Sequence, residues 1–151
     1  MTSTPNRNED GPGIAFVCVQ NAGRSQMAAA FAEREREARG FEDLEVVTGG
    51  TDPADAVHGE VVDAMRDAGI DLRDRTPREI TPEEIDGCAY VVTMGCSAEG
   101  VCPATWSGEN RDWGLEDPHG KEPEAVREIR DEIESRVNAL FDELEDARSA
   151  D

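Results

Sequence analysis

The chain has 151 residues, of which 35 are acidic and only 15 basic, so its formal net charge is −20. A charge of this sign and size repels nucleic acid and anionic membranes, and no apolar run is long enough to span a bilayer. The length suits one domain with a full core. Because the acids are spread over the whole chain, we interpret the charge as adaptation to a very salty cytoplasm, in which salt screens the self-repulsion.

Residues 1–13 are polar, contain proline and glycine, and lack the apolar core of a signal peptide. We expect them to be a disordered lead-in, and we expect the protein to be cytoplasmic and monomeric. Four cysteines in such a chain indicate catalysis, metal binding or redox exchange before structural disulfides. They are Cys18, Cys88, Cys96 and Cys102.

The stretch around which the chain is organised is residues 18–25, which read Cys-Val-Gln-Asn-Ala-Gly-Arg-Ser. It follows the apolar run 14–17 and opens into a helix predicted over 25–38. A strand that turns directly into a helix places the turn at the positive helix end, where unpaired N–H groups can bind an anion. Five residues separate Cys18 from Arg24, so thiol and guanidinium can face the same anion. The pattern predicts a nucleophilic thiolate facing a tetrahedral oxyanion.

Two neighbouring residues support this prediction. Gly23 gives the turn backbone freedom, and Ser25 can cap the helix and offer its hydroxyl to the Cys18 sulfur. The alternative is a small buried cysteine beside an ordinary turn, but the strand-to-helix context favours the nucleophile. The predicted oxyanion-binding residues are Cys18, Val19, Gln20, Asn21, Ala22, Gly23 and Arg24.

The rest of the chain alternates between strand and helix patterns. The predicted elements are a strand at 44–48, helices at 58–68 and from Thr81 to 86, a buried strand at 88–94, a long loop at 95–119 with a brief strand at 111–115, and an amphipathic helix from 123 onward. This alternation is typical of a parallel sheet sandwiched by helices, here in one domain over 14–145 with a tail at 146–151.

Asp117, followed by Pro118, lies in the long loop just before the last helix. If the loop folds over the mouth of the Cys18 turn, Asp117 can act as general acid to a leaving oxygen. Taken alone, an Asp-Pro pair is more often a simple turn. His58 and His119 have no convincing partner in the sequence.

Cys96 and Cys102 lie on one loop directly after the predicted strand 88–94. Two such thiols can relay a disulfide away from Cys18. A zinc site combining them with Cys88 or His119 is the competing hypothesis, but the spacing lacks the paired pattern of structural zinc. Cys88, which begins a buried strand, is interpreted as packing.

With these segments together, the chain resembles the low-molecular-weight phosphatase superfamily and, within it, the arsenate reductases that share that fold. The resemblance is carried, in order, by residues 16–28, 50–55, 91–96, 102–103, 112–113 and 116–118. It implies a four-stranded parallel sheet with helices on both faces, and an anion loop at the carboxyl end of the first strand.

The resemblance also implies a mechanism. Cys18 attacks arsenate held by Arg24 and the loop amides, while Asp117 protonates the departing oxygen. Cys96 then attacks Cys18 and releases arsenite, and Cys102 attacks Cys96 to move the disulfide to the loop. A thioredoxin-like protein, a glutaredoxin-like protein or a small thiol would reduce that pair, and no metal or organic cofactor takes part.

Two departures from the family pattern bear on this inference. Some thioredoxin-linked members have one more residue between the two loop cysteines, which leaves the order of attack open here. Some also bind potassium through an asparagine matched by Asn21 and a glutamate whose place is taken by Ala29, which counts against a potassium site.

Two alternative functions remain. A protein-tyrosine phosphatase would use Cys18, Arg24 and Asp117 to form and hydrolyse a phosphocysteine. That group usually has an aromatic residue after Asp-Pro, where this chain has His119, and it has no use for two loop thiols. A non-enzymatic oxyanion or redox sensor would have no reason to keep Asp117.

Overall fold

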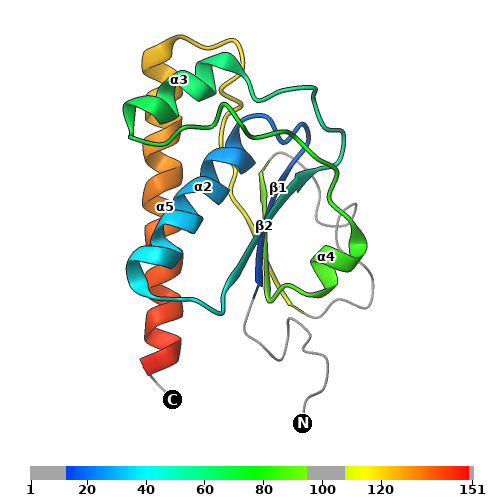
Figure 1. Ribbon diagram of the computed structural model, residues 1–151, viewed down its shortest axis with the longest axis vertical. Helices are drawn as coiled ribbons and strands as arrows, with labels where there is room; N and C mark the ends of the chain where they lie inside the picture. The colour runs from blue at the N-terminus through cyan, green and yellow to red at the C-terminus, as the bar shows by residue number, and fades with distance from the viewer. Residues whose placement is uncertain (1–12, 95–107, 150–151) are drawn as a thin grey trace.

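A parallel sheet of four strands forms the centre of the structure, a computed structural model that describes residues 13–94 and 108–149 (Figure 1). The spatial order is β2-β1-β3-β4, and each neighbouring pair is parallel. The strands are β1 (Gly13–Cys18), β2 (Glu45–Gly50), β3 (Tyr90–Met94) and β4 (Glu109–Asp112). The central position of β1 explains its apolar sequence, because both of its faces are covered.

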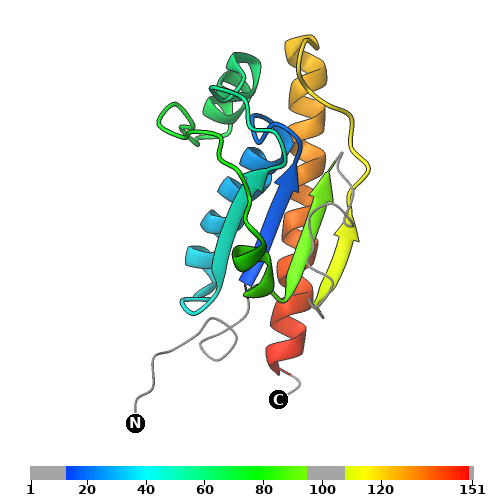
Figure 2. The same cartoon turned by 90° about the vertical axis from the view of Figure 1, so that its right-hand side faces the viewer.

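Helices cover the sheet on both sides, as Figure 2 shows. The helices are α2 (Arg24–Arg39), α3 (Gly59–Asp67), α4 (Pro82–Asp86) and α5 (Pro123–Ser149). The long helices α2 and α5 lie on one face, and the short helix α4 lies on the other (Figures 1 and 2). The predicted fold class, a four-stranded parallel sheet with helices on both faces, is therefore confirmed.

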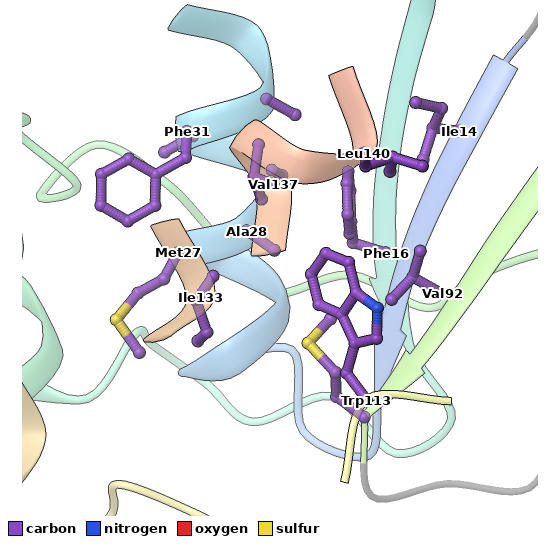
Figure 3. Close-up of a cluster of buried hydrophobic side chains, with 14 of the residues drawn as sticks. Ile14, Phe16, Met27, Ala28, Phe31, Val92, Trp113, Ile133, Val137 and Leu140 are labelled. Carbon is purple, nitrogen blue, oxygen red and sulfur yellow. The ribbon is translucent and has the colours of Figure 1, made fainter. Parts of the chain in front are cut away.

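The larger core lies between the sheet and the pair α2 and α5 (Figure 3). Phe16 and Val92 from the sheet are fully buried there, and Trp113 packs on Phe16 with ring centroids 6.0 Å apart. The smaller core on the α4 face is built from Ala15, Val17, Val47, Ile85, Cys88 and Val91. The alternating residues of β1 thus serve both cores, which fixes the strand in its register.

The start of α4 follows the predicted capping pattern. The Thr81 hydroxyl accepts a hydrogen bond from the Glu84 backbone N–H, and the Glu84 carboxylate accepts one from the Thr81 N–H. Pro82 occupies the first turn, where its missing N–H would have no partner in any case. These local signals are complete in the sequence, so the bounds of α4 could be predicted closely.

Most boundaries differ from the sequence prediction by one or two residues, and the differences at β1, β4 and α5 change how the chain is divided. β1 already includes Gly13, and β4 spans Glu109–Asp112 rather than 111–115. Helix α5 continues to Ser149, so residues 146–149 are helical and the predicted tail at 146–151 begins too early. The physical reason is that residues 145–149 contain no proline or glycine that would end the helix. Just before them, Arg39 of α2 pairs with Asp142 at 2.9 Å and with Glu145 at 3.1 Å.

The parallel register positions the candidate site. Cys18, the last residue of β1, pairs with Gly50 of β2 on one side and Met94 of β3 on the other. All these strands therefore end at the same edge of the sheet, the usual place for a ligand in an open α/β fold. Among the helices described, none has the length and apolar character that a bilayer crossing requires.

We predict that Gly50→Ala destabilises the protein, because a Cβ at Gly50 would collide with the Val19 carbonyl oxygen and lie 3.0 Å from the Asn21 backbone nitrogen. Both are backbone atoms of the turn after β1 and cannot swing aside. We expect a loss of about 1–3 kcal/mol, the usual cost of overpacking, measured by thermal unfolding at high salt.

The matched control is Gly59→Ala, since a Cβ at Gly59 meets nothing within 4 Å. This substitution should leave stability unchanged or raise it by about 0.4–1 kcal/mol. Equal melting temperatures for the two variants would contradict the close approach of β2 to the turn.

Candidate active site

A pocket of about 370 Å³ opens at the carboxyl edge of the sheet. It is lined by Cys18, Val19, Gln20, Ala22, Gly23, Arg24, His58, Asp117 and His119. The fold therefore brings Asp117 to the same pocket as the turn after β1, called here the anion loop (residues 18–24). Two other predicted site residues, Asn21 and Ser25, are fully buried. Cys96 and Cys102 lie outside the described residues.

The Cys18 sulfur is held by two polar neighbours. It lies 2.8 Å from the Ser25 hydroxyl oxygen and accepts a hydrogen bond from the Asn21 backbone N–H at 3.2 Å. When the sulfur is a thiolate, both neighbours can donate to it, and such charge-assisted hydrogen bonds are stronger than neutral ones. The arrangement suits a nucleophile at the floor of the pocket.

Asn21 is the residue that shapes the anion loop. Its φ is 53°, the left-handed region, which asparagine tolerates better than most residues with a side chain. Its amide nitrogen donates to the hydroxyls of Ser25 (2.7 Å) and Thr48 (2.9 Å). Its amide oxygen accepts from the Arg78 backbone N–H and from the Gln26 side chain, both at 3.0 Å. Every bond acts to keep the turn in one conformation.

Four carbonyl groups of the anion loop are bonded to the segment that follows β2. Those of Cys18, Val19, Gln20 and Ala22 accept hydrogen bonds from backbone N–H groups within residues 51–58, at 2.8–3.2 Å. Successive N–H groups of a turn whose carbonyls point outward form a concave anion-binding surface. The start of α2 adds the positive end of a helix.

Arg24 connects the anion loop to the segment that carries Asp117. Its guanidinium lines the pocket and donates a hydrogen bond to the Leu115 carbonyl at 2.7 Å. Ser25 does not cap α2 as expected, because the N-cap residue is Gly23 and no side chain bonds there. Ser25 lies inside the first turn, and its hydroxyl contacts the Cys18 sulfur, as predicted, and the Asn21 amide nitrogen.

The segment 115–120, which we call the acid segment, sits on the anion loop. Asp117 is exposed on the pocket wall, and its carboxylate accepts a hydrogen bond from the His119 backbone N–H at 3.0 Å. Pro118 is buried against Gly23, where an added Cβ would come within 3.2 Å of the proline ring. Glycine at position 23 thus permits the acid segment to close on the anion loop.

The rim of the pocket contains residues that sequence reasoning did not bring together. The rings of His58 and His119 are stacked with centroids 3.9 Å apart, and His58 Nε2 lies 3.1 Å from Gln20 Oε1. A hydrogen bond from the Gly120 N–H lowers the pKa of Glu60, and burial lowers the pKa of His58. No sequence signal links His58 to His119, which are 61 positions apart; only the fold does.

Cys88 lies elsewhere, in the core on the α4 face, and its thiol donates to the Glu84 carbonyl at 3.2 Å. This is the packing role predicted for it. Cys88 is buried on the face of the sheet opposite the larger core. A substitution of Cys88 can therefore serve as a control for substitutions of the other cysteines.

Comparison with known proteins agrees with this geometry. A family model described as low molecular weight phosphotyrosine protein phosphatase matches residues 13–150. A Halobacterium salinarum protein provisionally named an arsenate reductase is 60% identical over 132 residues, covering 87% of this chain and 92% of that protein.

Two solved structures are also similar. A thioredoxin-dependent arsenate reductase of Corynebacterium glutamicum is 32% identical with a TM-score of 0.74, over 90% of this chain and 63% of that one. An arsenate reductase in its phosphate-binding state is 28% identical with a TM-score of 0.74, over 88% and 98% of the two chains.

We predict that Glu84 stabilises the folded protein in a pH-dependent way, through contacts that lead to the anion loop. Its carboxylate bonds Arg78, whose backbone N–H holds Asn21. Although partial burial opposes it, hydrogen bonds from Arg78 and Thr81 lower the pKa of Glu84. A lowered pKa in the folded state stabilises the protein above the ordinary pKa of glutamate, and this gain is lost as pH falls through the lowered value.

Glu84→Gln should therefore be less stable than wild type by roughly 0.5–1.5 kcal/mol near neutral pH. The difference should shrink below about pH 4. Urea unfolding at both pH values measures it. The control is Glu83→Gln, an exposed neighbour in the same turn of α4, which should behave like wild type. A difference that is just as large in acid would mean that packing, not charge, carries the effect.

Proposed function

The chain belongs to the low molecular weight phosphotyrosine protein phosphatase family, and from this premise we propose that it reduces arsenate to arsenite. The observation that carries the proposal is the register of the sheet: Cys18, inside an anion-binding turn, pairs with Met94, two residues before Cys96. The Halobacterium relative and the Corynebacterium thioredoxin-dependent enzyme support the same activity.

In the first step, arsenate binds in the anion loop against its N–H groups and Arg24. The Cys18 thiolate attacks arsenic, an S–As bond forms, and one As–O bond breaks. Asp117, which lines the same pocket, donates the proton that lets the oxygen leave as water. The arsenic stays pentavalent in this step, so no reductant is needed yet.

In the second step, the Cys96 thiolate attacks the Cys18 sulfur. An S–S bond forms, the S–As bond breaks, and its electron pair reduces arsenic to the trivalent state, which leaves as arsenite. Cys96 lies outside the described residues. It follows Met94, the partner of Cys18 in the sheet, by two positions, whereas Cys102 follows Met94 by eight, so closeness in sequence favours Cys96 as the first partner of Cys18.

In the third step, Cys102 attacks Cys96, which frees Cys18 and leaves a disulfide between the two loop cysteines. A thioredoxin-type dithiol is the proposed reductant of this disulfide, by analogy with the thioredoxin-dependent Corynebacterium enzyme, and a small thiol is the alternative. Such a cycle needs a reducing compartment, which fits a protein of the cytoplasm. We further propose that the protein is a monomer, built as one domain from β1 to α5.

The charge of −20 and the Halobacterium relative together indicate work at high salt. Salt screens the repulsion among the acids that would otherwise destabilise the compact state. Assays of this protein therefore belong in concentrated potassium chloride.

The test compares arsenate reduction by wild type, Cys96→Ser and Cys102→Ser, with a thioredoxin system at high salt. Wild type should turn over many times. Cys96→Ser should release no arsenite, because no thiol attacks the Cys18–arsenic adduct, and Cys102→Ser should stop at one arsenite per chain, because its Cys18–Cys96 disulfide cannot move on. Cys88→Ser is the matched control and should turn over like wild type, since its thiol lies in the α4-face core.

Hydrolysis of p-nitrophenyl phosphate by the same samples distinguishes a phosphatase from an arsenate reductase. A slow hydrolysis that does not depend on Cys96 or Cys102 is compatible with a reductase. Rapid hydrolysis with no arsenite from any sample would instead make the protein a phosphatase.

A further inference from the structure

Three potential metal ligands meet on the rim of the pocket, and the reaction above uses none of them. His58 precedes α3, Glu60 lies in its first turn, and His119 belongs to the acid segment. One ligand atom from each lies within 4.8 Å of the other two. We propose that His58, Glu60 and His119 form a binding site for a divalent transition-metal ion of the zinc class.

The donor set decides which ions the site would take. Two imidazoles and one carboxylate suit Zn²⁺, Co²⁺ or Ni²⁺, whereas Mg²⁺ and Ca²⁺ prefer oxygen ligands alone. Two of the three ligand atoms are imidazole nitrogens, whereas clusters of exposed acids would offer only carboxylate oxygens. Three protein ligands leave a position for water on a tetrahedral ion.

Neighbouring groups already orient two of the ligands. The Gly120 backbone N–H donates to Glu60 Oε2 at 2.7 Å, and His58 Nε2 lies 3.1 Å from Gln20 Oε1. Contacts of this kind orient the ligands of known metal sites from outside the coordination sphere. His119 Nδ1 lies 3.4 Å from Glu60 Oε2, so these two ligands are already neighbours.

Binding requires one rearrangement. Zinc bonds of about 2.0–2.1 Å place tetrahedral ligand atoms roughly 3.4 Å apart, so a pair within 4.8 Å must close by about 1.4 Å at most. The two rings are stacked with an interplanar angle of 23°, and their nitrogen lone pairs do not converge until one ring turns. His119 can turn, because 58% of its side chain is exposed and the next residue, Gly120, takes a left-handed turn at φ 80°.

An ion at this site would join the start of α3 to the acid segment. His58 and His119 line the same pocket as Cys18, so the ion would lie at the edge of that pocket. It would restrain the segment that carries Asp117 and narrow the entrance for an oxyanion. Occupancy should therefore inhibit the enzyme reversibly. This inference does not depend on the proposed arsenate chemistry, because phosphate-ester hydrolysis would use the same entrance.

Cobalt tests the site directly, because its visible absorption reports the coordination and its near-ultraviolet charge transfer reports thiolate ligands. The full chain, reduced and in concentrated potassium chloride with excess Mg²⁺ to occupy surface acids, is titrated with Co²⁺. Wild type should bind one equivalent with a visible spectrum and without the thiolate band. His119→Ala and Glu60→Gln should each weaken binding at least tenfold, with folding checked by circular dichroism.

Asp63→Asn is the matched control, since Asp63 is an exposed carboxylate on the same helix outside the cluster. It should bind Co²⁺ like wild type. Inhibition of p-nitrophenyl phosphate hydrolysis by Zn²⁺, reversed by a chelator, should weaken in His119→Ala by the same factor as binding. Equal Co²⁺ affinity in all variants, a thiolate spectrum, or no binding below millimolar Co²⁺ would each overturn the proposal.

Discussion

The conformation of Asn21 is the constraint on which the site depends. A left-handed residue three positions after the end of β1 reverses the chain so that the Asn21 N–H bonds the Cys18 sulfur. Four side-chain hydrogen bonds hold this buried residue, and their partners come from α2, β2 and the segment before α4. Because an unmet buried amide costs about 1–3 kcal/mol per group, the loop shape and the stability of the fold are coupled.

The remaining structure brings the acid segment to this turn. Parallel pairing ends β1, β2 and β3 at one edge, which places Gly50 and Met94 beside Cys18. Arg24 bonds Leu115, and Pro118 packs on Gly23, so the anion loop and the acid segment share one interface. The proposed general acid, Asp117, thus stands at the pocket because its neighbours Leu115 and Pro118 contact the anion loop.

The sequence predicted the features that local signals determine. The alternation of apolar strands and amphipathic helices indicated the fold class, and the Thr81 and Glu84 pair marked the start of α4 because capping is complete within four residues. It failed where partners are distant. Nothing in the sequence joined His58 to His119 or Thr48 to Asn21, because only tertiary packing creates those contacts. Ser25 does not cap α2, but its predicted contact with the Cys18 sulfur is present.

The most direct test of the account is a single turnover without any external reductant. Reduced protein is mixed with arsenate at high salt, quenched in acid and alkylated, and both arsenite and the disulfide-linked peptides are quantified by mass spectrometry. The account predicts one arsenite per chain together with a Cys96–Cys102 disulfide, while Cys18 and Cys88 are recovered alkylated. Arsenite formed without any disulfide, or a disulfide that involves Cys88, would contradict it.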